Sequence, residues 1–216
     1  MRRTSPSTSR CTAAALALSL LAGCATLLGV NREPPRLYLL NAESPASPAT
    51  TTAANPSLGL GPVDLPGYLD RQGIVTRVGP NRLETSHNDL WAESVVGNFK
   101  DVLAEDLRLR LPGTTIRPLP WSPSTRPALS VAVDVSRFEA TSSGTAELYA
   151  LWTLRETEQQ TVVGSHEARI SQPIASGGTE AAVAALGQAV AALSDEIAAE
   201  VARHTSAPPP ARRRTS

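Results

Sequence analysis

The stretch that decides the fold is residues 129–136, which have the sequence LSVAVDVS. Large apolar side chains stand at every second position, and smaller or polar side chains stand between them. Because successive side chains of a β-strand point to opposite faces, this alternation predicts a strand with one buried face. We therefore expect a sheet that packs against the core on one side.

Two further strands follow in the sequence. Residues 147–154 carry large apolar side chains on one face, and residues 161–170 alternate less regularly. The links at residues 142–144 and 156–160 are short and polar. Links of this length favour antiparallel hairpins between neighbouring strands.

A long amphipathic helix is predicted over residues 93–111, and Pro112 and Gly113 end it. Asp106 and Arg110 are expected on its other faces, where such a pair is worth about 0.2–0.5 kcal/mol. Apolar residues recur in it at spacings of three and four, which places them on one face. This stripe consists of Val96, Phe99, Leu103, Leu107 and Leu111.

A second helix is predicted near the C-terminus, with Thr179 as its cap. Its apolar stripe predicts that the helix packs on the sheet, although a coiled coil with a partner helix would use the same pattern. The stripe consists of Val183, Leu186, Val190, Leu193, Ile197 and Val201.

The region before the first helix is predicted to hold short strands and a turn at residues 65–71. Residues 42–57 are rich in Ala, Ser, Pro and Thr, and we expect a flexible loop there. Two long helices and a mixed sheet with antiparallel hairpins predict a single layered α/β or α+β domain over residues 36–204. The additional strands are expected at residues 36–40, 58–63, 73–78, 82–85 and 114–117.

The first 23 residues have the pattern of a bacterial signal peptide. Three arginines precede an apolar run at residues 13–21, which is shorter than the roughly 20 residues of a membrane span. The run ends in Leu21-Ala22-Gly23-Cys24, where small residues followed by cysteine are typical of lipoprotein processing. We therefore expect cleavage before Cys24, followed by attachment of lipid to its thiol and its amine.

Residues 24–35 then form the expected lipidated tether of a domain that faces the periplasm. Ala25 follows the cysteine where an aspartate would favour the inner membrane, so the outer membrane is favoured. The alternative is an ordinary signal peptide with an accidental cysteine.

Processing removes Cys11 and acylates Cys24, so we expect no disulfide and no cysteine chemistry in the mature chain. It also removes three arginines and no acid, which leaves 17 basic residues, 20 acidic residues and a net charge of −3. This balance argues against nucleic acid as a partner. Residues 205–216, which contain Arg212-Arg213-Arg214, are expected to be a disordered basic tail.

Motifs of common enzymes are missing from the sequence. It has no G-x-S-x-G, no Walker loop and no H-E-x-x-H. His87, His166 and His204 lie far apart, and His87-Asn88-Asp89 is expected to be a polar turn rather than a catalytic or metal site. We expect no enzyme activity, no metal and no cofactor other than the lipid on Cys24.

Two stretches of the sequence carry a family likeness. One is residues 61–77, continuing through residues 81–83 to Leu90-Trp91-Ala92-Glu93. The other is Leu111-Pro112 followed by Pro120-Trp121 and residues 135–138. Together with the motif at Cys24, these stretches make residues 36–200 resemble the ABC-type transport auxiliary lipoprotein family, the PqiC-like proteins.

The resemblance implies a non-enzymatic partner of a transport system. Such lipoproteins accompany a membrane permease, an ATPase and a substrate-binding subunit of the mammalian-cell-entry type. These systems are thought to move lipids or other apolar solutes between the two membranes.

Three residues of the first stretch are candidates for a partner-docking face. They are Tyr68, Arg71 and Trp91, and these residue types are favoured in protein interfaces. Alternatively, Tyr68 and Arg71 brace a Pro/Gly turn. Trp121, between two prolines, is expected to be a core plug.

Three functions follow as hypotheses. The first is a docking and tethering subunit of a lipid-transport ABC system. The second is a carrier that holds a lipid in an apolar cavity, and the third is a structural envelope lipoprotein.

Overall fold

The computed structural model describes residues 33–47 and 57–206. All helices and strands named below belong to one unit of the chain, which begins at Pro35. The expected signal peptide, Cys24, most of the tether and most of the tail lie outside the described residues, as do residues 48–56.

Strand β6 (Leu129–Thr141) lies in the middle of the sheet and contains residues 129–136. One edge of β6 pairs antiparallel with β7 (Thr145–Glu156), and β7 pairs antiparallel with β8 (Thr161–Pro173). The two antiparallel hairpins that the short polar links predict are therefore confirmed.

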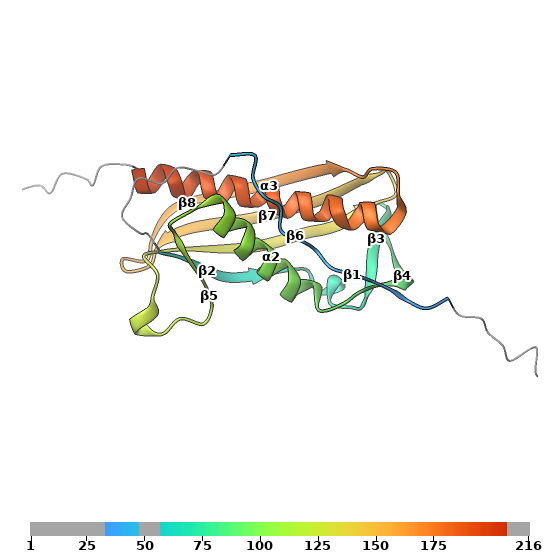
Figure 1. Cartoon of the computed structure of the whole chain (residues 1–216), viewed down its shortest axis with the longest axis horizontal. Coiled ribbons are helices and arrows are strands. Elements are labelled where there is room, and N and C mark those ends of the chain that lie inside the picture. The colour runs from blue at the N-terminus through green and yellow to red at the C-terminus, as the bar shows by residue number, and fades with distance from the viewer. Residues whose placement is uncertain (1–32, 48–56, 207–216) are drawn as a thin grey trace, which may run out of the picture. The chain divides into compact units, whose positions relative to one another are not determined.

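The other edge of β6 is shared by two parallel strands. β2 (Ser57–Asp64) pairs with its first half, and β3 (Gly73–Gly79) pairs with its last two residues. β5 (Thr115–Pro118) adds to β2, β4 (Arg82–Trp91) adds antiparallel to β3, and β1 (Arg36–Tyr38) adds parallel to β4. The strands of the described residues thus form one eight-stranded mixed sheet (Figure 1).

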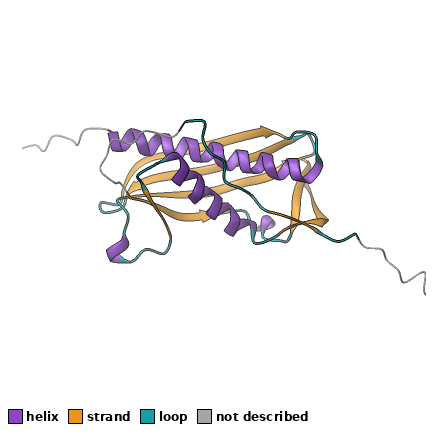
Figure 2. Ribbon diagram, in the orientation of Figure 1, coloured by secondary structure: helices purple, strands orange, loops and turns teal. Residues whose placement is uncertain are grey.

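Two helices, α2 (Val95–Arg110) and α3 (Gly178–Ser206), cover one face of this sheet (Figure 2). The apolar stripe of α3 is buried along its whole length, as its periodicity predicts. On the opposite face of the sheet, Leu151 of β7 is 52% exposed. The predicted layered α+β fold is confirmed, with a sheet covered on one side.

Helix α3 is long and apolar enough to cross a membrane by length and composition alone. Its apolar residues are buried against the sheet and α2, as expected for a core helix. The helix begins at Gly178, one residue before the predicted cap. The hydroxyl of Thr179 donates a hydrogen bond to Asp89 of β4.

The strand predicted at residues 82–85 is confirmed, but the polar turn predicted at residues 87–89 was wrong. β4 continues through His87-Asn88-Asp89 to Trp91, whereas a short strand followed by a polar turn was expected. Pairing explains the difference, because Asp89, Leu90 and Trp91 are in register with the three residues of β1. Long-range partners of this kind leave no local signal in the sequence.

Other predicted boundaries shift in the same way. Glu43, in the expected flexible loop, has both its backbone N–H and its backbone carbonyl hydrogen-bonded to side chains of α2. Ser57, the last residue of that loop, is the first residue of β2. Helix α3 extends to Ser206, so the first two residues of the expected tail are helical. The rest of both segments lies outside the described residues.

The 3-10 turns η1 (Gly67–Leu69) and η2 (Pro123–Thr125) follow β2 and β5. The turn that was predicted at residues 65–71 contains η1. Trp121 was predicted to be a core plug, but it is only half-buried. Its ring lies over Gly59 of β2. A Cβ atom on Gly59 would lie 2.3 Å from Cζ2 of Trp121, so only glycine fits beneath this ring.

Candidate functional site

The chain enters the domain through residues 36–43, which we call the entry segment. β1 forms its first part and adds to the edge of the sheet beside β4. Beyond Tyr38 the segment leaves the sheet and passes between α2 and α3 (Figure 1). Leu40 is only 3% exposed there, so this crossing is part of the core.

Asp89 holds the beginning of the entry segment. Its Oδ1 accepts hydrogen bonds from Nε of Arg36 (2.8 Å) and the hydroxyl of Tyr38 (3.2 Å). Its Oδ2 accepts from the hydroxyls of Ser86 (3.1 Å) and Thr179 (2.9 Å). This arrangement, which we call the Asp89 clasp, joins β1, β4 and the first turn of α3.

The surroundings of Asp89 keep it ionised. Desolvation acts to raise the pKa of its carboxyl, but the hydrogen bonds from Thr179, Arg36 and Ser86 together outweigh it and leave the pKa below the ordinary value. A carboxylate is also favourable beside the N-terminus of a helix, where the peptide dipoles expose positive charge. The clasp is therefore a charged contact at neutral pH.

Asn98 of α2 holds the middle of the entry segment. Its Oδ1 accepts a hydrogen bond from the backbone N–H of Leu40 (2.7 Å), and its Nδ2 donates to the carbonyl of Leu40 (3.4 Å). Both side chain and backbone are buried. Asn98 thus replaces the strand partner that Leu40 lacks after β1 ends.

Asp106 and Arg110 hold the end of the entry segment in the same manner. Asp106 Oδ1 accepts from the backbone N–H of Glu43 (2.8 Å), and Arg110 Nη1 donates to the carbonyl of Glu43 (2.9 Å). Arg110 also pairs with Asp106 (3.2 Å) and, through Nε, with Asp195 of α3 (2.6 Å). We call Asn98, Asp106 and Arg110 the α2 latch.

The three latch side chains are buried, which differs from the prediction for Asp106 and Arg110. Asp106 and Arg110 were expected on the faces of α2 away from its apolar stripe, yet they are 0% and 3% exposed. They are covered because the entry segment lies over this side of the helix. The spacing of eight and four residues places Asn98, Asp106 and Arg110 on one side of a helix, and this regularity was the only available signal.

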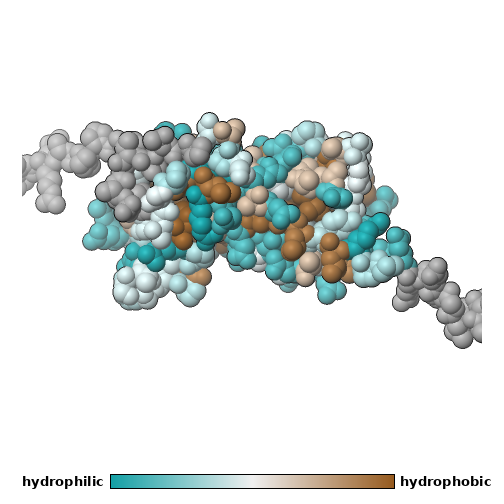
Figure 3. All heavy atoms as spheres, in the orientation of Figure 1, coloured by the Kyte–Doolittle hydropathy of each residue, from teal (hydrophilic) through white to brown (hydrophobic). Residues whose placement is uncertain are grey.

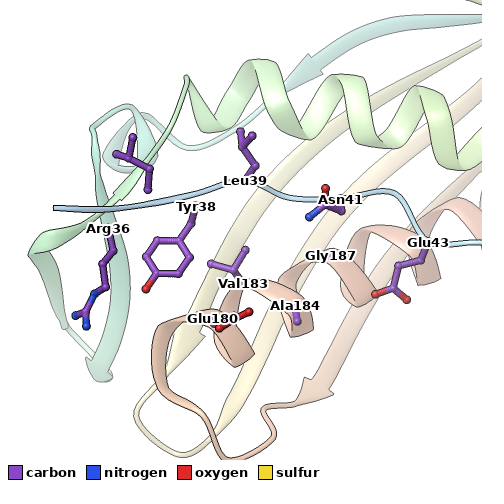
Figure 4. Close-up of a pocket in the computed structure, with 10 residues that line it drawn as sticks. Arg36, Tyr38, Leu39, Asn41, Glu43, Glu180, Val183, Ala184 and Gly187 are labelled. Carbon is purple, nitrogen blue, oxygen red and sulfur yellow. The ribbon is translucent and has the colours of Figure 1, made fainter.

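A groove of about 540 Å³ runs along the entry segment and α3. Figure 4 shows Arg36 and Tyr38 extending from the strand toward α3, whereas Leu39 points to the other side of the strand. Val183, Ala184 and Gly187 form its floor on α3. Charged groups stand at its ends, at Arg36, Glu43 and Glu180.

Tyr68 turns inward rather than toward a partner. Its hydroxyl donates a hydrogen bond to Oε2 of Glu139 on β6, and Arg77 of β3 pairs with Oε1 of the same carboxylate at 2.6 Å. Glu139 is 1% exposed. Desolvation and the hydrogen bond to Glu139 raise the pKa of Tyr68 to about 12. Tyr68 therefore braces η1 against the sheet.

Trp91 is the last residue of β4, and Arg71 lies two residues before β3. Trp91 is 7% exposed and belongs to the core, and its backbone N–H donates to the carbonyl of Gln72 (2.7 Å). Arg71 is exposed, and its Nη1 lies 3.5 Å from the hydroxyl of Thr85. Both residues line a hollow of about 260 Å³ at the start of α2.

The three predicted docking residues therefore do not form one surface. Arg71 and Trp91 share a hollow, but Tyr68 belongs to the Glu139 network and only Arg71 is exposed. Of the three candidates, Arg71 is the exposed one. Arginine and tyrosine patterns in the sequence cannot show which side chains a short turn directs inward.

The histidines lie on three different elements. His87 is exposed on β4, His166 stacks on Trp152 with ring centroids 4.4 Å apart, and His204 lies 3.2 Å from Glu156. Over residues 33–47 and 57–206, no three histidine, cysteine, aspartate or glutamate side chains are grouped to hold a metal ion.

A family model described as the ABC-type transport auxiliary lipoprotein component matches residues 38–198. The chain belongs to this family. The match begins inside the entry segment and ends in α3, so it includes the α2 latch and all of the Asp89 clasp except Arg36. No curated protein sequence matches this auxiliary lipoprotein.

Solved structures share the fold of the auxiliary lipoprotein. One crystal structure of an uncharacterized protein is 22% identical, with a TM-score of 0.66, and the match covers 78% of this chain and 99% of that one. A Xanthomonas campestris protein assigned to the DUF330 family is 20% identical, with a TM-score of 0.61 and coverage of 78% and 95%. At these identities the likeness establishes the fold alone.

Replacing Arg110 tests the α2 latch. Arg110→Ala leaves a buried carboxylate without its cation, and we expect the free energy of unfolding to fall by about 3–5 kcal/mol. Arg108→Ala is the matched control, because Arg108 forms an exposed pair with Glu105 whose loss costs about 1 kcal/mol or less. Urea titrations measure both changes, and equal small losses would contradict the latch.

The protonation of Asp106 should make stability depend on pH. Burial raises the pKa of Asp106 to about 6 from an ordinary value of 3.8, so the folded protein binds this proton more tightly than the unfolded chain. The contribution of Asp106 to stability is therefore fully present below pH 4 and is lost as the pH rises through 6. Urea titrations across this range should show wild type losing stability relative to Asp106→Asn, and the exposed Asp101→Asn controls for the charge change.

Proposed function

We propose that this auxiliary lipoprotein is held at a membrane by lipid on Cys24 and serves an ABC-type transport system for lipids or other apolar solutes by docking to other proteins. Membership of the family supports the transport role. The sequence around Cys24 supports the anchor, and Ala25 supports the periplasmic face of the outer membrane. The role is non-catalytic.

The attachment of the entry segment carries this proposal. Only eleven residues separate Cys24 from Arg36, where β1 begins. From that point the Asp89 clasp and the α2 latch fix the chain to β4, α2 and α3. A domain that hangs from its N-terminus needs such a junction, because the ends of a domain otherwise open most readily.

The partner we propose is a substrate-binding subunit of the mammalian-cell-entry type, together with its permease and ATPase. The resemblance of residues 61–77 and 90–93 supports this choice. Arg71 is the exposed residue of that stretch, beside the hollow that Trp91 also lines. Arginine is favoured where interfaces form, so the docking face is placed here.

The lipid anchor is tested by Cys24→Ser. The variant should move from the envelope pellet to the soluble fraction after cell lysis or remain unprocessed, and it should incorporate no labelled palmitate. Cys11→Ser changes a cysteine that the signal peptide takes away, so its processing and fractionation should match wild type. A mature, unlabelled Cys24→Ser protein that still sediments with the envelope would overturn the anchor.

The docking face is tested by Arg71→Glu. Affinity purification of the lipidated wild-type protein from detergent-solubilised envelopes should recover the mammalian-cell-entry subunit, and the variant should bind that subunit about tenfold more weakly. Arg117→Glu makes the same charge change on exposed β5 and should bind as wild type does. Failure of the wild-type protein to recover such a subunit would remove the proposed partner.

A further inference from the structure

Two large apolar side chains are exposed where the chain enters the domain. Leu37 is 65% exposed and Leu39 is 44% exposed, whereas Tyr38 and Leu40 between and after them turn inward. Side chains two residues apart in an extended chain share one side, so the leucines project together. Figure 3 shows apolar surface along β1 and the chain that follows it.

This exposure belongs to a fixed strand. The Asp89 clasp holds Arg36 and Tyr38 on the inner side, and Asn98 holds both backbone groups of Leu40. The leucines are therefore presented in one orientation instead of collapsing onto the core. Large apolar side chains presented together in this way mark surfaces that another apolar phase covers.

The surroundings of the leucines resemble a boundary between water and an apolar phase. They border the groove whose floor is Val183 and Ala184, while Arg36, Glu43 and Glu180 stand at its ends. The side chain of Arg36 is 55% exposed, and its Nε pairs with Asp89 on the inner side of the strand. Arginine and tyrosine beside leucine are typical of segments that lie at a membrane interface.

The length of chain before β1 identifies what covers this surface. Twelve residues from Cys24 to Arg36 reach at most about 40 Å when fully extended. The leucines therefore stay close to whatever bilayer holds the anchor. Residues 25–32 also include Leu27, Leu28 and Val30, which favour the bilayer in the same way.

We propose that Leu37 and Leu39 rest in the surface of the bilayer that carries the lipid anchor. This inference rests on the proposed anchor at Cys24 and adds an orientation to it. The entry segment then lies against the membrane, and β1 fixes how the sheet and α3 stand above it. Leu151 lies on β7, which strands β4, β3 and β6 separate from β1 in the sheet.

Fluorescent labels at single cysteines test the contact. The mature chain, residues 24–216, with Cys24→Ser has no other cysteine, so Leu37→Cys, Leu39→Cys and Leu151→Cys each give one labelling site. An N-terminal hexahistidine attaches the chains to vesicles of phosphatidylethanolamine and phosphatidylglycerol that contain nickel-chelating lipid. Leu151 is the matched control because it is 52% exposed, between the values for the other two leucines.

We expect the emission of an environment-sensitive label to rise severalfold at positions 37 and 39 on the vesicles, and nitroxide-labelled lipid to quench it. The label at position 151 should stay as it is in solution. If all three positions remain in water, or if positions 37 and 39 are covered only when a transport subunit is added, the membrane contact is wrong. Because nickel attachment replaces the natural lipid, this experiment tests the membrane contact of the leucines independently of whether Cys24 is acylated in the cell.

Discussion

A buried crossing of the backbone sets the main constraint on this structure. Residues 40–43 pass between two helices after β1 has ended, and of these Leu40 is buried and Glu43 is partly buried. The backbone N–H and C=O groups of Leu40 and Glu43 have no strand to pair with there. An unpaired buried backbone group costs as much as a lost hydrogen bond, so other groups must supply the partners. Asn98, Asp106 and Arg110 do so, and for this reason α2 carries polar side chains on a side that is covered.

The same contacts tie the N-terminal end of the domain to the sheet and to both long helices. Arg110 reaches Asp195, so the latch joins α2 to α3, and the Asp89 clasp joins β1 and β4 to the start of α3. The chain that follows Arg36 is therefore hydrogen-bonded to the sheet and to both helices.

Local periodicity was sufficient for the parts of the fold that depend on neighbouring residues. The alternation of residues 129–136 and the stripe of Val183 to Val201 each predict an element and the face that it buries, and both are confirmed. The hairpins β6–β7 and β7–β8 follow because their links are short. The parallel pairings of β2 with β6 and of β1 with β4 join distant residues, and no local pattern marks them.

In the candidate site, too, some features could be predicted from local sequence and others depended on the tertiary structure. The sequence by itself determined the helices, the central strands, a single layered domain and the likeness to a transport lipoprotein, because these rest on spacing and motif within short stretches. Only the tertiary structure decided that Asp106 and Arg110 are buried, that Asp89 holds β1, and that Tyr68 turns inward while Arg71 stays exposed. Whether a polar side chain is buried depends on which distant segment packs over it. A local sequence pattern does not show which segment that is.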